Sequence, residues 1–237
     1  MLNIAHKPPF WQTPVTSSAF SGSHTSEVYE MDCIAGMKEY PDKYFDLAVV
    51  DPPYGININH SMGRRKCQKK SNCKKADWDN EPPPLEYFYE LFRVSKKQIV
   101  WGANHFISRM PYDSSCWIIW DKENGENDFA DCEMAWASFG TAVRRFKFRW
   151  AGMLQGNMKD KEIRMHPTQK PVALYDFIYS RYATEGMKVL DTHLGSGSSR
   201  ISANKAKLHF VGCEIDEEYF NKQNKRYEEF VSQARLW

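Results

Sequence analysis

The sequence predicts an α/β fold, with a doubly wound, mostly parallel twisted sheet and helices on both faces. The first observation behind this prediction is the nearly continuous apolar run from Phe45 to Val50, which is typical of a parallel strand covered on both faces. The second is a strand-helix-strand unit near the C-terminus, in which strands at Lys188 to Asp191 and His209 to Glu214 flank a helix. The third is that strands and helices alternate without an internal repeat, which favours a doubly wound sheet.

Length and composition agree with one folded domain. The 237 residues, 42% of them hydrophobic, suffice for one large core. We expect residues 1–26 to be an extended or partly disordered lead-in, because they are rich in Ser, Thr and Pro, and residues 27–237 to form the domain. A net charge of +2 excludes a histone-like polyanion binder. No apolar run reaches the roughly 18 residues of a membrane span and no secretory signal is visible, so we expect a cytoplasmic protein without a membrane partner.

The domain is expected to begin with three short elements and a loop. A strand at Val28 to Met31 and a helical turn at Ala35 to Glu39 precede the apolar strand at Phe45 to Val50. Residues at about 56–84 carry seven Lys and Arg residues and end in three consecutive prolines, which predicts a long basic loop.

Two helices frame the middle of the domain. One runs from Leu85 to about Val94, and the other begins at Pro171 and ends at Gly186, with apolar residues at helical spacing. Four strand candidates lie between them: Gln98 to Gly102, Cys116 to Asp121, Glu133 to Phe139 and Phe146 to Trp150. In the C-terminal unit, the expected helices run from about Ser199 to Lys205 and from Glu217 to about Gln233.

The six cysteines lack the paired short spacings of a disulfide scaffold or a zinc module. We therefore expect reduced thiols and no metal. A zinc site at Cys67, Cys73 and His60 is disfavoured, because the spacing of the two cysteines is atypical.

A glycine-containing turn follows the strand at Lys188 to Asp191. In Gly195-Ser196-Gly197, missing side chains let a ligand approach the backbone, and the amides of the next helix face it. Asp191 can accept hydrogen bonds from an ammonium group. Glu214 ends the next strand, at the spacing of roughly twenty residues along the sequence at which an acidic side chain binds ribose hydroxyls. The pattern favours a nucleoside-type cofactor, with a generic tight turn or an NAD site as alternatives.

The segment Asp51-Pro52-Pro53-Tyr54 ends the apolar strand at the sheet edge where α/β proteins bind ligands. Asp51 and the Pro52 carbonyl can accept the two hydrogens of an exocyclic amine, and Tyr54 offers a face on which a base can stack. The alternative is a proline-stiffened turn capped by an Asp.

With these motifs in this order, the chain resembles the permuted β-group of DNA amino-methyltransferases, from about Glu27 to the last helix. Thr168-Gln169-Lys170-Pro171 resembles the segment that these enzymes place before their cofactor strand. The resemblance implies S-adenosylmethionine as cofactor and a catalytic centre at Asp51, Pro52, Pro53 and Tyr54. It also implies a set of cofactor-binding residues: Thr168, Lys170, Asp191, Thr192, Gly195, Ser196, Gly197 and Glu214.

The sequence departs from this family in two places. Thr192-His193-Leu194 replaces the residues that usually follow the Asp, so His193 receives no role. The stretch between Trp150 and His166 is short where many relatives carry a target-recognition region, so sequence specificity is expected to be low or to reside elsewhere.

The basic loop is the candidate for DNA contact, because Lys and Arg neutralise phosphates; a solvated charge run is the alternative. Trp78 or His60 could fill the space left by a flipped base. The phosphate contacts are predicted at Arg64, Arg65, Lys66, Lys69 and Lys70.

We therefore predict site-specific methyl transfer to adenine N6 of a flipped base in DNA. Cytosine N4 is the alternative, but Ser in place of Asp51 is more usual among cytosine enzymes of the resembled family. An inactive nucleic-acid-binding relative, an RNA methyltransferase and a nicotinamide oxidoreductase are disfavoured. A homodimer and a cognate restriction endonuclease stay open as partners.

Overall fold

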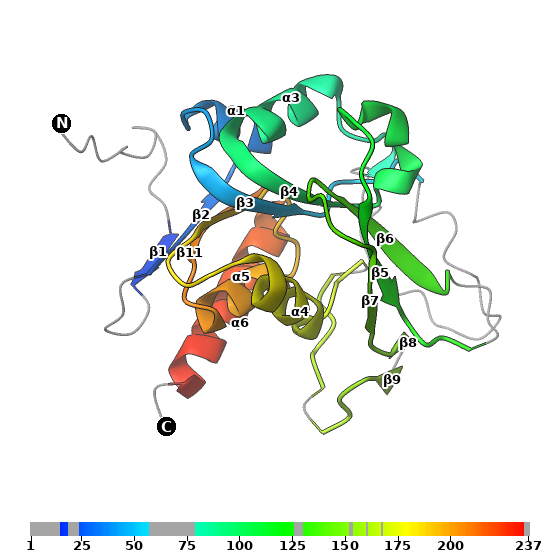
Figure 1. Cartoon of the computed structure of the whole chain (residues 1–237). Coiled ribbons are helices and arrows are strands. Elements are labelled where there is room, and N and C mark those ends of the chain that lie inside the picture. The colour runs from blue at the N-terminus through cyan, green and yellow to red at the C-terminus, as the bar shows by residue number, and fades with distance from the viewer. Residues whose placement is uncertain are drawn as a thin grey trace.

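A nine-stranded mixed sheet forms the centre of the protein (Figure 1). The computed structural model describes residues 15–18, 24–56, 79–125, 130–151, 154–159, 161–166 and 168–234. In order across the sheet, the strands are β1 (Val15–Ser18), β2 (Thr25–Glu30), β11 (His209–Glu214), β10 (Lys188–Asp191), β3 (Phe45–Val50), β4 (Ser95–Trp101), β6 (Cys132–Ala137), β5 (Cys116–Asp121) and β7 (Arg144–Lys147).

The middle of the sheet is parallel and its margins are mixed. Strands β2, β11, β10, β3 and β4 all run in one direction. Strand β1 is antiparallel to β2, β6 is antiparallel to both β4 and β5, and β7 is parallel to β5. The predicted fold class is therefore confirmed, and the strands at 45–50, 116–121, 188–191 and 209–214 have the predicted bounds.

Helices cover both faces of the sheet (Figure 1). Helices α1 (Cys33–Lys38) and α3 (Leu85–Val94) lie on one face, and α4 (Val172–Tyr182), α5 (Ser198–Lys205) and α6 (Glu217–Ala234) lie on the other. Alternate residues of β3 supply the two cores: Leu47 belongs to the core that includes Leu174 of α4, whereas Ala48 belongs to the core that includes Leu91 of α3. Burial on both faces explains why β3 is apolar at nearly every position.

Three local predictions need correction. Residues 15–18 form strand β1 inside the segment expected as a lead-in, because they pair with the edge of β2; their Ser-rich sequence hides this pairing. The strand expected at 146–150 is divided into β7 and β8 (Trp150–Ala151), and β8 pairs with β9 (Leu154–Gln155) outside the main sheet. Helix α4 ends at Tyr182, four residues before Gly186, because the backbone at Ala183 is already extended.

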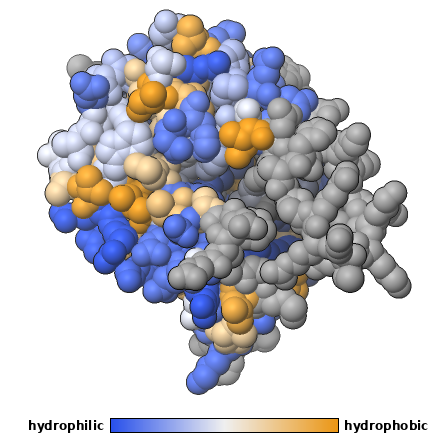
Figure 2. Space-filling model, turned by 90° about the vertical axis from the view of Figure 1, so that its right-hand side faces the viewer, coloured by the Kyte–Doolittle hydropathy of each residue, from blue (hydrophilic) through white to orange (hydrophobic). Residues whose placement is uncertain are grey.

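The surface of the described residues is mixed in character. On the face drawn in Figure 2, hydrophobic residues form separate small groups among hydrophilic ones. Within the described ranges, no helix has both the length and the apolarity that crossing a bilayer requires. Most of the predicted basic loop, including its five proposed DNA contacts, Trp78, His60, Cys67 and Cys73, lies outside the described residues.

Candidate active site

Acidic residues stand at or just beyond the carboxyl ends of four neighbouring parallel strands, in the sheet order β2, β11, β10 and β3. Asp51 follows β3 directly, Asp191 ends β10 and Glu214 ends β11. Asp32 lies two residues beyond β2 and caps α1 by accepting a hydrogen bond from the Ala35 amide (2.9 Å). This edge is where open parallel sheets bind ligands, so the predicted catalytic and cofactor motifs share one site.

Asp51 is the centre of a compact polar cluster. The Tyr54 hydroxyl donates to its Oδ1 (2.7 Å), and the Lys170 ammonium contacts its Oδ2 (2.6 Å). Burial raises the pKa of Asp51, and the positive charge of Lys170 opposes that rise. The carboxylate is thus oriented by two donors, while each of its oxygens retains further accepting capacity.

The turn after Asp51 is held by Asp79. One oxygen of this carboxylate accepts hydrogen bonds from the amides of Tyr54 (2.8 Å) and Gly55 (3.0 Å). Asp79 is 3% exposed, so the two bonds are sheltered from water. They fix the backbone that presents the Tyr54 ring.

The Tyr54 ring packs against the segment after β4. It stacks with the His105 imidazole at a centroid distance of 5.1 Å and an interplanar angle of 16°. At Gly102, whose φ is +69°, a Cβ atom would lie 2.0 Å from Tyr54 Cε1. Only glycine leaves room for the ring here.

Lys170 lies beside the predicted catalytic residues. Its ammonium contacts Asp51, the Tyr54 hydroxyl (3.0 Å) and Glu133 (3.0 Å). Burial lowers the pKa of Lys170, but Asp51 and Glu133 more than offset this effect, so its pKa is raised. The lysine predicted to enclose the cofactor is therefore bound to the predicted catalytic carboxylate.

The glycine turn is bound to the acidic residues of β10 and β11. Gly195 donates its amide to Glu214 (2.8 Å), and Asp191 accepts from the His193 amide (3.1 Å) and the Ser199 hydroxyl. Burial raises the pKa of Asp191 to about 7. Since both of these donors are neutral, a cationic ligand would suit this carboxylate.

His166 covers the glycine turn. Its ring is the nearest group to a Cβ built on Gly195 (3.7 Å), and it lies edge-on to Tyr219 of α6 (4.3 Å). Thr168 bonds to His166 Nδ1 through its hydroxyl (3.0 Å). Burial lowers the pKa of His166 to about 4, so the ring is neutral at pH 7. The segment 166–170 thus joins the cofactor turn to Asp51.

Thr192 and His193 belong to a second network beside Asp191. The Thr192 hydroxyl bonds to Tyr87 of α3 (2.7 Å) and to His193 Nδ1 (2.9 Å), and His193 Nε2 lies 4.0 Å from Cys33 Sγ. Burial lowers the pKa of His193 to about 4. His193, which received no role from the sequence, orients Thr192 and its neighbours.

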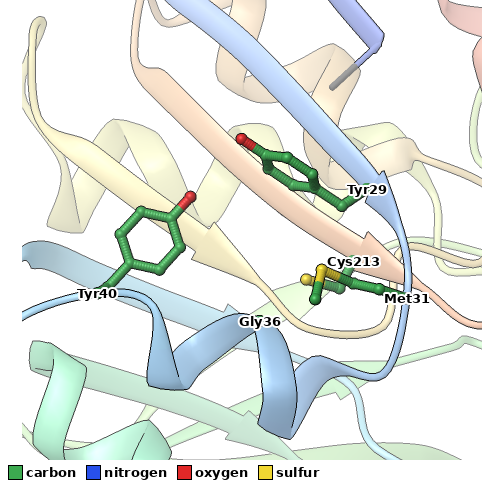
Figure 3. Close-up of a pocket in the computed structure, with 5 residues that line it drawn as sticks. All are labelled: Tyr29, Met31, Gly36, Tyr40 and Cys213. Carbon is green, nitrogen blue, oxygen red and sulfur yellow. The ribbon is translucent and has the colours of Figure 1, made fainter. Parts of the chain in front are cut away.

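The small cavity in Figure 3 lies between α1 and the neighbouring strands β2 and β11. It is lined by Tyr29, Met31, Gly36, Tyr40 and Cys213. Its volume of about 10 Å³ is at the lower limit for one water molecule, so it cannot hold a nucleoside. In the described parts of the chain, no group of three His, Cys, Asp or Glu residues is arranged to hold a metal ion.

Comparison with known proteins identifies the family. The model of the DNA methylase family of N6 and N4 methyltransferases matches residues 99–225, more than half of the chain. The chain belongs to this DNA methylase family. As predicted, it is an S-adenosylmethionine-dependent DNA methyltransferase.

Two curated relatives resemble this DNA methylase along most of its length. The type II methyltransferase M2.MboI of Moraxella bovis is 22% identical, over 86% of this chain and 88% of the relative. The type II methyltransferase M.HinfI of Haemophilus influenzae is 26% identical, over 84% of this chain and 67% of the relative.

Solved structures share the fold of this DNA methylase. A complex of M1.HpyAVI with S-adenosylmethionine is 20% identical, covers 84% of this chain and 98% of its own, and has a TM-score of 0.50. The cytosine-N4-specific PvuII DNA methyltransferase is 11% identical, covers 90% of this chain and 93% of its own, and has a TM-score of 0.56.

Among the residues of the candidate site that sequence reasoning missed are Asp32, His166, Glu133 and Tyr87. For Asp32 a signal existed, an acidic residue just beyond a predicted strand, as at Asp51 and Glu214. His166 stands directly before the segment 168–171 that carries the family resemblance. No local pattern marks the other two, whose contacts depend on sheet order and helix packing: Glu133 and Tyr87.

Proposed function

We propose that this protein methylates adenine N6 at specific sites in DNA and that Asp51 holds the target amine. The observation that carries the proposal is the partly buried Asp51 carboxylate, oriented by Tyr54 and Lys170 at the strand end next to Asp191. The resemblance of Asp51-Pro52-Pro53-Tyr54 to adenine-type motifs supports adenine over cytosine.

Asp51 and the Pro52 carbonyl would accept the amine hydrogens and so direct the nitrogen lone pair. S-adenosylmethionine, when bound, supplies a methyl group whose carbon–sulfur bond breaks as the nitrogen–carbon bond forms; sulfur keeps the electron pair and the positive charge moves to nitrogen. The nitrogen then releases one proton to water. The catalytic role would thus consist of orientation and of negative charge beside a nitrogen that becomes cationic.

The residues around the glycine turn would hold the cofactor. Asp191 suits its cationic amino-acid end and Glu214 suits ribose hydroxyls. Gly195, Ser196 and Gly197 would contact the bound cofactor. Thr192 would fix the segment after β10, and Thr168 would fix the segment before α4. For Lys170 we propose a role at Asp51 in addition to enclosure of the cofactor, since its charge and hydrogen bonds are directed there.

DNA is the proposed substrate, with the target base flipped out of its stack. Contacts to phosphate are proposed for Arg64, Arg65, Lys66, Lys69 and Lys70. A cytoplasmic location and membership of a restriction-modification system complete the proposal.

The test is mass spectrometry of nucleosides from plasmid DNA incubated with S-adenosylmethionine and the protein. We expect N6-methyladenine with the wild type and at least a hundredfold less with Asp51→Ala. Asp46→Asn is the matched control, because Asp46 lies at the opposite end of β3 and is bound to Lys96 (2.7 Å). N4-methylcytosine would overturn the base assignment, and an unmodified plasmid would overturn the proposed activity.

A further inference from the structure

Four alternating charges form a connected row that ends at Asp51. Lys122, the residue after β5, is paired with Glu133 of β6. Glu133 is paired with Lys170 (3.0 Å), and Lys170 is paired with Asp51 (2.6 Å). The Lys170 side chain is only 3% exposed, so its charge interactions are weakly screened by water.

Lys170 is directed at Asp51 by its contacts within this cluster. Its ammonium donates hydrogen bonds to Asp51 (2.6 Å) and to the Tyr54 hydroxyl (3.0 Å), and it forms an ion pair with Glu133 (3.0 Å). The same group lies 5.3 Å from the ring centroid of Trp101. Lys170 therefore acts on the carboxylate beside it.

The summed charge of the row depends on Glu133. Lys122, Lys170, Glu133 and Asp51 together add up to zero, whereas the row without the Glu133 charge would carry one positive charge. Burial opposes ionisation of Glu133, but Lys170 and Lys122 lower its pKa to about 2, so the group is charged at any working pH. A net positive charge around Asp51 would oppose the positive charge that develops on the amine nitrogen.

We propose that Glu133 is a positioning residue for methyl transfer, which holds Lys170 between two carboxylates and prevents a net positive charge beside the target amine. This inference rests on the proposed role of Asp51 but is independent of whether the base is adenine or cytosine. Glu133 itself acts through Lys170.

The test compares wild type, Glu133→Gln and Glu133→Asp in steady-state methylation of plasmid DNA across pH. With Glu133→Gln we expect kcat to fall about tenfold or more, while KM for DNA and for S-adenosylmethionine changes less than about twofold. Glu133→Asp keeps the charge and should restore most of kcat. Thermal unfolding of each variant checks that the fold is intact.

The pH profile separates a charge effect from a structural one. Burial is the main cause that raises the pKa of Asp51, and the Glu133 charge raises this pKa further. Glu133→Gln should therefore lower the pKa of Asp51 and move the acid limb of kcat to lower pH, while the plateau value of kcat falls. The charged or titratable groups that interact with Asp51 in the described chain are Lys170, Glu133, Tyr54, Tyr87, Tyr175 and Asp191.

Three outcomes would contradict the inference: an unchanged kcat with Glu133→Gln, a lower kcat with an unshifted acid limb, or equal losses with Gln and Asp. Wild-type protein that methylates no base would overturn the proposed function, and this inference with it.

Discussion

At the scale of single residues, the buried Asp191 carboxylate is proposed to bind the cationic end of the cofactor and is therefore expected to make cofactor binding depend on pH. Burial raises its pKa to about 7, from an ordinary 3.8. In the cofactor-free protein, the stability contributed by the protonated form is lost as pH rises from about 4 through 7. A cationic cofactor favours the ionised form, so its affinity must change in the opposite direction.

We expect the affinity for S-adenosylmethionine to rise roughly tenfold between pH 6 and pH 8 as Asp191 ionises. Isothermal titration calorimetry at several pH values measures this rise. Asp191→Asn should bind weakly and lose the dependence. His166, whose pKa burial lowers to about 4, does not titrate in this window. A flat affinity in the wild type would exclude Asp191 as a ligand of the cofactor.

Gly102 offers a second residue-scale prediction, because Gly125 provides a matched control. Both glycines have a φ of +69°, but a Cβ at Gly102 would collide with the Tyr54 ring, whereas a Cβ at Gly125 meets nothing within 4 Å. Both Ala substitutions carry about 1–2 kcal/mol of backbone strain. Only Gly102→Ala should displace Tyr54 and lower kcat, by roughly a hundredfold or more. Equal rates for the two variants in the methylation assay would refute this role for Gly102.

The residues that the sequence could predict are those with a local pattern. Asp51, Tyr54, Asp191 and Glu214 each follow or end an apolar strand, and the structure brings their segments together at one edge. Glu133 gave no such signal. It is the second residue of β6, and it meets Lys170 only because β6 pairs next to β4.

At the scale of elements, the edge strand β7 presents basic side chains near the site. Arg145 and Lys147 are exposed on β7, and Arg149 follows it. Lys147 is opposite Asp121, the residue before Lys122, so this edge lies at the same end of the sheet as the charged row. Basic side chains in this position fit a DNA backbone.

Arg145→Gln combined with Arg149→Gln should therefore weaken binding to DNA of any sequence. The slope of log affinity against log salt concentration should become shallower by roughly 0.9 for each phosphate that the protein no longer neutralises. Fluorescence anisotropy at several salt concentrations measures the slope. Lys205→Gln with Lys207→Gln, before the start of β11, is the control. Identical slopes for both pairs would remove β7 from the DNA interface.

The elements themselves were predictable where periodicity is strong. Strands β3, β10 and β11 were found with their bounds because apolar runs ended at turn residues. The sequence did not predict the division between β7 and β8, because Phe146, Phe148 and Trp150 alternate as in one continuous strand. The rings of Phe146 and Phe148 are stacked at a centroid distance of 5.8 Å. This packing does not require the backbone to stay in the sheet, so the aromatic pattern does not reveal where the strand ends.

At the scale of the whole molecule, ligand binding should raise the unfolding temperature, because the site joins both halves of the chain. At a concentration one hundred times the Kd, S-adenosylmethionine should add about 2.7 kcal/mol of stability. For a chain of this size that corresponds to a rise of about 5–10 °C in Tm. Differential scanning calorimetry should show the rise in wild type and Asp51→Asn, and a much smaller one in Asp191→Asn. No rise in the wild type would contradict cofactor binding.

The order of strands along the chain also affects how the protein is made on the ribosome. Leu47 of β3 pairs with Val189 of β10, and β2 pairs with β11, so β2 and β3 wait for partners that are synthesised about 140 residues or more later. At 5–20 residues per second, β3 emerges roughly 7 to 28 seconds before β10. During that time one edge of β3 has no neighbour, and an apolar unpaired edge promotes aggregation. The nascent chain is therefore expected to need a chaperone at this edge, and to become able to methylate DNA only after β10 and β11 have been synthesised.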